Sequence, residues 1–244
     1  DRPVRPLFAD GYRFETQIVA SVISSDAEND PDVIAITGAS CALYLSDIPF
    51  HNPIAGIRIG LIDGKYVINP TFDERRESQL NLIVAGTEEA ICMVECEAEE
   101  VEETIMVEAL MLAHREIKRL CLWQKELGKA LEITKREFTP AALDEAIVAE
   151  VEKNFADKLR AALDSTGRDK IAVYAGLDAL KKEVVESYPE EDAAKRSMAA
   201  KAFGYLKEKI FREDMLVNKR RPDGRRFSEI RPITCEVGWL PRVH

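Results

Sequence analysis

Two arginines near the start of the sequence are the first candidates for chemistry. Arg2 and Arg5 lie in the segment DRPVRPLF (Asp1–Phe8), whose prolines are incompatible with a regular helix or a central strand. We therefore expect a stiff, extended loop that holds both guanidinium groups in place, and a guanidinium can donate two parallel hydrogen bonds to a phosphate. The pattern suggests phosphate binding. The alternative is a pair of surface arginines that bond local carbonyls or Asp1.

A second basic segment lies near the other end of the chain. Residues 219–226 read KRRPDGRR, so they form either another phosphate-contacting turn or a solvated linker between domains. The whole chain has a formal net charge of −10, which argues against a protein that coats nucleic acid nonspecifically. The charge is uneven, because residues 1–135 carry 13 basic and 24 acidic side chains whereas residues 215–244 carry 7 and 3. An acidic chain can thus still present a local basic edge.

The sequence shows no self-contained catalytic or metal site. The histidines, His51, His114 and His244, lack metal-ligand spacing, the five cysteines lack zinc-site spacing, and no GxSxG, Walker or GxGxxG motif is present. Nine glutamates and no basic residue lie between Glu88 and Glu108. Paired carboxylates can hold Mg²⁺, but strand alternation and a helix start also place such side chains in water, which is the interpretation we favour. We therefore predict no catalytic residue and no metal ligand in this chain.

Hydrophobic patterning of the first 130 residues predicts an α+β layer, with helices on one side of a mixed sheet. Asp63-Gly64 is the dipeptide favoured in a two-residue hairpin turn. The expected strands cover residues 17–23 (a buried strand), 57–62, 65–68, 80–85 and 91–97, and the expected helices cover residues 32–46 and 102–128. The inner face of the second helix is predicted to consist of Ile105, Ala109, Leu112, Leu120, Trp123 and Leu127.

Composition changes near residue 136, and the segment that follows predicts a small all-helical bundle. Thr139-Pro140 is a predicted helix start, and two further helices are expected over residues 169–187 and 190–214. The apolar residues that recur every four positions in the first of these helices are Leu143, Ile147, Val151, Phe155 and Leu159. Residues 230–237 look like the beginning of a strand; this feature and the absence of Met at position 1 lead us to expect a segment of a longer protein. The sequence contains no run of about 18 apolar residues, so we expect no transmembrane helix.

Ordered motifs along the chain resemble those of bacterial polynucleotide phosphorylases. The segment DRPVRPLF is similar to a signature of that family. The other similar segments are SDAENDPD (25–32), GAS (38–40), NLIVAGT (81–87), MVECEAEEV (93–101), PDGRR (222–226), IRPI (230–233) and EVGWLPRVH (236–244). The resemblance covers nearly the whole chain, although residues 136–214 match mainly in position and helical character.

The resemblance implies a subunit in which an all-helical domain lies between two ribonuclease-PH-like domains. Residues 1–130 would be the C-terminal part of the first such domain, residues 136–214 the helical domain, and residues 218–244 the start of the second. The implied fold class is α+β: a ribonuclease-PH-like mixed sheet with helices, followed by an all-α helical bundle. Arg2 and Arg5 would line the RNA path, whereas the family's phosphate-binding loop and metal-binding aspartates would lie beyond residue 244.

The resemblance also implies the activity of the parent protein. That protein would be a phosphate-dependent 3′-to-5′ exoribonuclease that degrades single-stranded RNA to nucleoside diphosphates in mRNA turnover, with Mg²⁺ as cofactor and inorganic phosphate as co-substrate. The implied partners are single-stranded RNA, the other subunits of a homotrimeric ring and proteins of an RNA-degradation complex, all in the cytoplasm and away from membranes. We expect this chain alone to be inactive. Two alternatives remain open: a non-catalytic RNA-binding and ring-assembly module, and a helical protein-interaction module.

Overall fold

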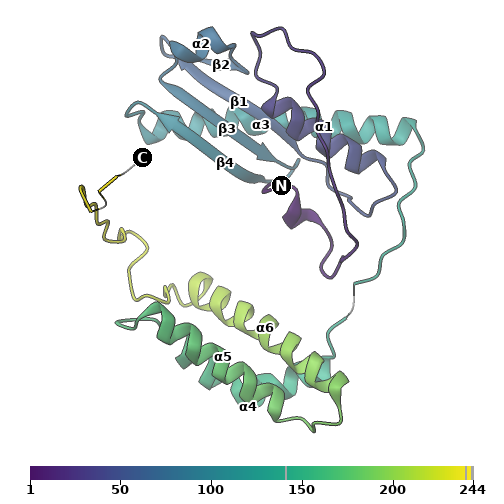
Figure 1. The fold of residues 1–244 in the computed structure, drawn as a ribbon, viewed down its shortest axis with the longest axis vertical. Coiled ribbons are helices and arrows are strands. Elements are labelled where there is room, and N and C mark those ends of the chain that lie inside the picture. Colours follow the sequence, from purple (N-terminus) through teal and green to yellow (C-terminus); the bar gives the residue numbers. More distant parts are fainter. Residues whose placement is uncertain (141, 240, 243–244) are drawn as a thin grey trace. The chain divides into compact units, whose positions relative to one another are not determined.

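The computed structural model describes residues 1–140, 142–239 and 241–242. The chain divides into two compact units, Asp1–Ala141 and Ala142–His244. Every strand of the described ranges belongs to the first unit, and the second contains helices (Figure 1). The predicted α+β class is therefore confirmed. None of the helices in these ranges has an apolar stretch long enough to cross a bilayer.

The first unit contains a four-stranded sheet. Its strands are β1 (Ala55–Ile62), β2 (Lys65–Ile68), β3 (Leu80–Gly86) and β4 (Ile91–Ala98). The order is β2-β1-β3-β4 and every neighbouring pair is antiparallel, so the predicted mixed sheet is wrong. Both hairpin connections are too short for the crossover that a parallel pair requires. The predicted turn is confirmed, because Asp63 and Gly64 have φ values of 48° and 72°.

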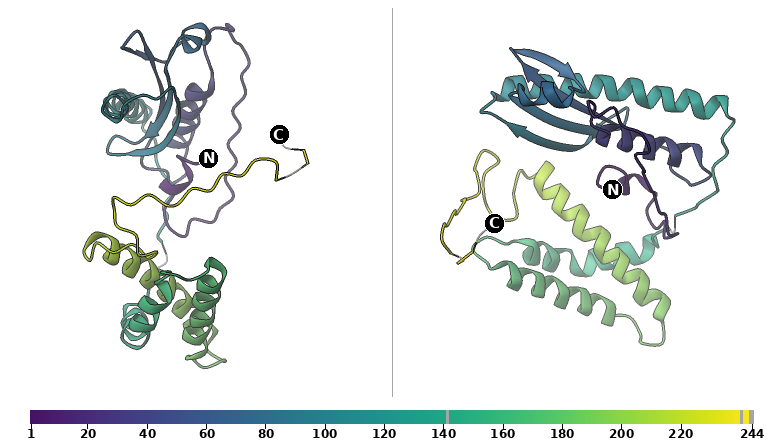
Figure 2. Two further views of the ribbon diagram at one scale, coloured as in Figure 1. Left: turned by 90° about the vertical axis from the view of Figure 1, so that its left-hand side faces the viewer. Right: turned by 45° about the horizontal axis from the view of Figure 1, so that its top comes forward.

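Helices cover both faces of this sheet rather than the single face that was predicted. The long helix α3 (Glu103–Ala130) packs on the face formed by alternate residues of β1 and β3, such as Ile59 and Leu82. Helix α1 (Asp32–Leu45) lies against the opposite face, since a Cβ atom at Gly56 would lie only 3.1 Å from Cβ of Ile36 (Figure 2). A short helix, α2 (Phe72–Arg76), begins at a capping box and lies between β2 and β3.

Of the six residues predicted for the inner face of α3, Ala109 is buried and four others are partly buried. Trp123 is exposed, because the buried stripe runs through smaller or polar residues. The buried residues of α3 are Ala109, Ala113, His114, Ile117, Cys121, Gln124 and Gly128. Small side chains allow close approach: a Cβ at Gly128 would lie 2.8 Å from the Tyr44 ring of α1.

The predicted buried strand over residues 17–23 is wrong. This segment has no regular secondary structure and is exposed, with Ile23 at 96%. A strand requires hydrogen-bonding partners, and within the described residues neither edge of the sheet, β2 or β4, pairs with it.

The second unit is a three-helix bundle, as predicted. Its helices are α4 (Glu145–Leu163), α5 (Lys170–Glu186) and α6 (Ala193–Leu216). The first begins at Asp144, whose carboxylate accepts from the N–H groups of Ala146 and Ile147, and not at Thr139-Pro140. The predicted period of four is confirmed by the buried residues Ile147, Val151, Phe155 and Leu159. Residues 230–237 are exposed and irregular, so the predicted strand start is wrong there, while residues 240, 243 and 244 lie outside the described part.

Candidate nucleic-acid interface

The N-terminal loop is fixed by its backbone and by one buried side chain. The N–H groups of Val4 and Arg5 donate to the carbonyl of Asp1 at 3.0 and 2.9 Å. Val4 is buried in a hydrophobic cluster that includes Phe50. A short 3₁₀ helix spans Arg5–Leu7, so the loop is turned there and not extended as predicted. The fixed φ of proline suits a first helical turn, which explains the difference.

The two predicted RNA-binding residues project from this fixed backbone into solvent. The Arg5 side chain is 77% exposed and chelates Asp1, with Nη2 at 2.9 Å from Oδ1 and Nε at 3.1 Å from Oδ2. The Arg2 side chain is 62% exposed, and its Nη1 lies 3.0 Å from Oε1 of Glu95 on β4. Each arginine thus pairs with a different carboxylate, and the two guanidinium groups do not meet at one shared site. Exposed ion pairs contribute about 0–1 kcal/mol, so a phosphate can replace either carboxylate at small cost. Phosphate binding by Arg2 and Arg5 stays a prediction.

A buried ion network lies on the α1 face of the sheet and was missed in the sequence. Arg58 of β1 is 3% exposed, and its Nη2 pairs with Asp30 at 3.2 Å and with Asp32. Its Nη1 donates to Oδ1 of Asn81 at 2.6 Å, while Arg75 donates to Asp30 at 2.6 Å. A charged residue inside the apolar run AGIRIGLI was the available signal. The network fixes the segment that precedes α1 against the sheet.

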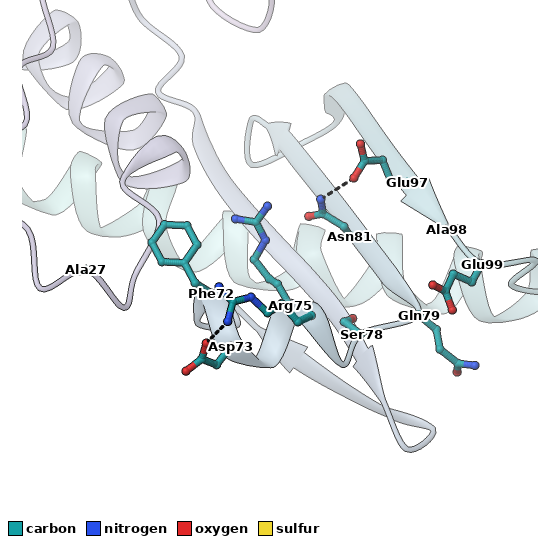
Figure 3. A pocket seen from close by; sticks show the side chains of 11 residues that line it. Ala27, Phe72, Asp73, Arg75, Ser78, Gln79, Asn81, Glu97, Ala98 and Glu99 are labelled. Atoms are coloured by element: carbon teal, nitrogen blue, oxygen red, sulfur yellow. Dashed lines mark hydrogen bonds and ion pairs between the residues drawn. The ribbon is translucent and has the colours of Figure 1, made fainter.

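A polar hollow of about 590 Å³ borders this network (Figure 3). Its lining contains two basic and three acidic side chains. Arg76 donates to Asp73 at 2.9 Å, and the Asn81 amide donates to Glu97 at 3.2 Å. Phe72 lies beneath the Arg75 guanidinium, which is 5.6 Å from the ring centroid. The hollow therefore has no excess of positive charge that would attract a phosphate, and its carboxylates form no metal-binding group among the described residues.

The described part of the chain has no cluster of metal-binding side chains. It contains no group of three or more His, Cys, Asp or Glu side chains arranged to hold a metal ion. The ring Nε2 of His114 lies 3.2 Å from the carbonyl oxygen of Thr87, so this buried histidine joins α3 to the β3–β4 loop. The absence of catalytic residues and metal ligands from this chain stays a prediction.

Two basic side chains after α3 are used structurally. Nζ of Lys135 donates to the carbonyl oxygens of Leu43, Tyr44 and Ser46 at 3.0, 2.7 and 2.9 Å, which satisfies the C-terminal end of α1. Burial lowers the pKa of this lysine. Arg136 pairs with Asp47 at 2.7 Å. Lys135 is therefore not free to contact nucleic acid, whereas Arg136 forms an exposed ion pair like those of Arg2 and Arg5.

Comparison with known proteins identifies the family. Residues 52–116 match the model described as 3′ exoribonuclease family, domain 2, and residues 146–226 match the model described as polyribonucleotide nucleotidyltransferase, RNA binding domain. Over its whole length the chain is 49% identical to the polyribonucleotide nucleotidyltransferase of Solibacter usitatus and 45% identical to that of Koribacter versatilis. The chain belongs to the polyribonucleotide nucleotidyltransferase family.

The chain spans about a third of the length of its curated relatives in this family, 34% for Solibacter usitatus and 30% for Koribacter versatilis. A polyribonucleotide nucleotidyltransferase from Listeria welshimeri gives the same result, with 44% identity over the whole chain and 34% of the relative covered. The exoribonuclease match falls on the sheet and α3, and the RNA-binding match falls on α4 to α6 with the basic segment after them. The assignment of residues 1–130, 136–214 and 218–244 to the three domains of the family stays a prediction.

Proposed function

We propose that the parent protein is a phosphate-dependent 3′-to-5′ exoribonuclease that degrades single-stranded RNA to nucleoside diphosphates in mRNA turnover. The observation that carries this proposal is the similarity of the entire chain to polyribonucleotide nucleotidyltransferases at 42–49% identity. The two family models match in separate units, one named for an exoribonuclease and one for RNA binding.

The reaction is a transfer of the terminal nucleotidyl group to phosphate. An oxygen of inorganic phosphate attacks the phosphorus of the last phosphodiester, and the bond from that phosphorus to the 3′ oxygen of the preceding nucleotide breaks. The shortened RNA leaves with a 3′ hydroxyl, and the last nucleotide leaves as a nucleoside 5′-diphosphate. The described residues lack a donor set suited to Mg²⁺, since their carboxylates form no metal-binding group, so we place the ligands of this cofactor outside the chain.

Within that enzyme the chain has a positioning role. Arg2 and Arg5 stand on a rigid, exposed loop and are suited to phosphate contacts, which hold a strand without reading its sequence. The sheet and the bundle serve as scaffold for a homotrimeric ring. The ring acts in the cytoplasm on single-stranded RNA, with proteins of an RNA-degradation complex as further partners.

Release of ADP from poly(A) tests the proposal. The complete gene product should release ADP only when inorganic phosphate is present, and the 244-residue chain alone should release none. Release of AMP without a phosphate requirement would show hydrolysis and refute phosphorolysis, while ADP from the chain alone would refute its inactivity. RNA binding without turnover by the complete product would support the alternative of a non-catalytic ring module.

Substitution of the two arginines tests their role. Arg2→Ala with Arg5→Ala in the complete product should weaken poly(A) binding and reduce the log–log salt slope by roughly 0.7 per arginine, the value for single strands. Arg13→Ala is the matched control, because Arg13 is also exposed but lies after the DRPVRPLF segment. An unchanged affinity, together with a protein partner that docks on residues 140–214, would favour the helical protein-interaction module.

A further inference from the structure

The helical unit, which matches the model described as polyribonucleotide nucleotidyltransferase, RNA binding domain, contains a groove of about 970 Å³. The match does not say which residues contact RNA. Two stripes line the groove, one on α5 and one on α6, and each repeats at positions i, i+3, i+4 and i+7. The stripe residues are Lys170, Val173, Tyr174 and Leu177 on α5, and Gly204, Lys207, Glu208 and Phe211 on α6. Figure 1 shows the two helices side by side, and residues 222–231 complete the wall.

The groove is apolar at its base and aromatic at its sides. Val173 and Leu177 are buried beneath it, whereas Tyr174 is 57% exposed and Phe211 is 42% exposed. A Cβ atom at Gly204 would meet no atom within 4 Å, so the α6 side of the groove is open at that point. Exposed rings beside open space provide the stacking platforms that nucleobases use in proteins that bind single strands.

The lining is basic although the whole chain is acidic. Five basic and two acidic side chains line the groove. One of the acids, Asp223, already accepts from Nε of Arg225 at 2.8 Å, and this hydrogen bond holds the pKa of its carboxyl below the usual range. Among the described residues, Lys207 and Arg231 form no side-chain hydrogen bond or ion pair, whereas the nearby Lys209 pairs with Glu152 at 2.7 Å. The groove therefore combines aromatic rings with basic groups that are available to an anion.

We propose that this groove binds a short stretch of single-stranded RNA. Bases stack on Tyr174 and Phe211, and backbone phosphates contact Lys170, Lys207 and Arg231. The inference deepens the proposed function, because it rests on RNA as the substrate of the parent enzyme. An acidic peptide would satisfy the basic groups, but it would leave the two rings exposed, which is why RNA is the occupant that the whole lining fits.

The test measures binding of a fluorescein-labelled oligo(A) of about 10 nucleotides, within the usual site size, to the complete 244-residue chain by anisotropy at several salt concentrations. One variant, Lys207→Ala with Arg231→Ala, removes charge. A second, Tyr174→Leu with Phe211→Leu, removes the rings and keeps the sites apolar. Lys201→Ala with Tyr205→Leu is the matched control, since both are exposed residues of α6 outside the groove.

The two groove variants should fail in different ways. Loss of the rings should weaken binding about tenfold or more with an unchanged salt slope, because stacking contributes about 1–3 kcal/mol per base. Loss of the charges should also weaken binding and lower the slope by roughly 0.7 per residue. The control should bind within twofold of the wild type, and circular dichroism should show the same melting for all variants.

Three outcomes would overturn the groove proposal. The first is wild-type affinity in both groove variants while Arg2→Ala with Arg5→Ala weakens binding, which would leave the proposed function intact. The second is efficient competition by poly(glutamate) with no effect of the ring substitutions, which would indicate an acidic protein partner. The third is a wild-type chain that does not bind oligo(A) at low salt. The ADP-release assay on the complete product decides the proposed function independently of all three.

Discussion

Replacement of Gln124 by leucine should destabilise the first unit, because it breaks buried hydrogen bonds that link three parts of the fold. This residue of α3 is fully buried, and its Nε2 donates to the carbonyl of Ile54 at 2.8 Å. Its Oε1 accepts from Oγ of Ser40 on α1 at 2.9 Å, and that hydroxyl in turn accepts from the Ile54 N–H at 2.8 Å. The closed network therefore links α1, α3 and the residue that precedes β1.

The magnitude follows from what Gln124→Leu leaves unpaired. The Ser40 hydroxyl loses its acceptor and the Ile54 carbonyl loses its donor, both in the interior. Each unsatisfied buried polar group costs about 1–3 kcal/mol, so the free energy of unfolding should fall by about 2–4 kcal/mol after a small gain from the apolar side chain.

Urea unfolding checks this value. Fluorescence of Trp123, one position before the substitution, reports on the first unit, and circular dichroism at 222 nm reports on both units. Gln79→Leu is the matched control, because Gln79 is exposed and should change stability by less than about 0.5 kcal/mol. A loss below about 0.5 kcal/mol for Gln124→Leu would show that the network does not hold α1 and α3 together.

Two further predictions concern a titration and a pair of glycines. The carboxyl of Asp26 accepts from the backbone N–H of Asn29 at 2.9 Å, from its side-chain amide and from the N–H of Glu28, which lowers its pKa to about 2. Its stabilising contribution should be complete above the unfolded value of 3.8 and be lost as pH falls through about 2. Carbon-13 NMR titration should show this midpoint and an upward shift in Asn29→Ala; an unshifted midpoint near 3.8 in the wild type would contradict the geometry. Gly56→Ala should destabilise by about 1–3 kcal/mol, because the new Cβ would lie 3.1 Å from Ile36 and 3.2 Å from the Val33 carbonyl. Gly204→Ala should instead stabilise α6 by about 0.5–1 kcal/mol, since its Cβ enters open space. Thermal melting of both variants checks the two predictions, and a change of melting temperature in the same direction for both would refute them.

Local signals predicted the elements whose structure is determined locally. Asp63-Gly64 identified the β1–β2 hairpin because positive φ is a property of the dipeptide itself. The residues from Ile147 to Leu159 identified α4 because a period of four places one stripe on the core. The start of that helix was misplaced because both Thr139 and Asp144 are plausible caps, and only the carboxylate of Asp144 meets free N–H groups.

Features that depend on contacts between distant segments were missed. The Val- and Ile-rich segment 17–23 has strand propensity, but a strand also needs a neighbour, which the sequence of the segment does not specify. Arg58 lies within an apolar strand, and its partners Asp30 and Asp32 lie more than 25 positions earlier, so no local pattern indicates the ion pairs. The groove was missed for the same reason: each stripe reads as an ordinary amphipathic face until α5 and α6 are placed together.

The distribution of paired and available basic side chains has a consequence for RNA affinity. In the first unit Arg58, Arg75 and Lys135 are held by carboxylates or carbonyl oxygens. A guanidinium that leaves a carboxylate for a phosphate exchanges one anion for another and gains little, whereas a solvated Lys207 or Arg231 gains from the release of counterions. With a net charge of −10, the rest of the chain repels RNA at low salt. If this chain binds RNA, we therefore expect the basic groove to supply a share of the attraction.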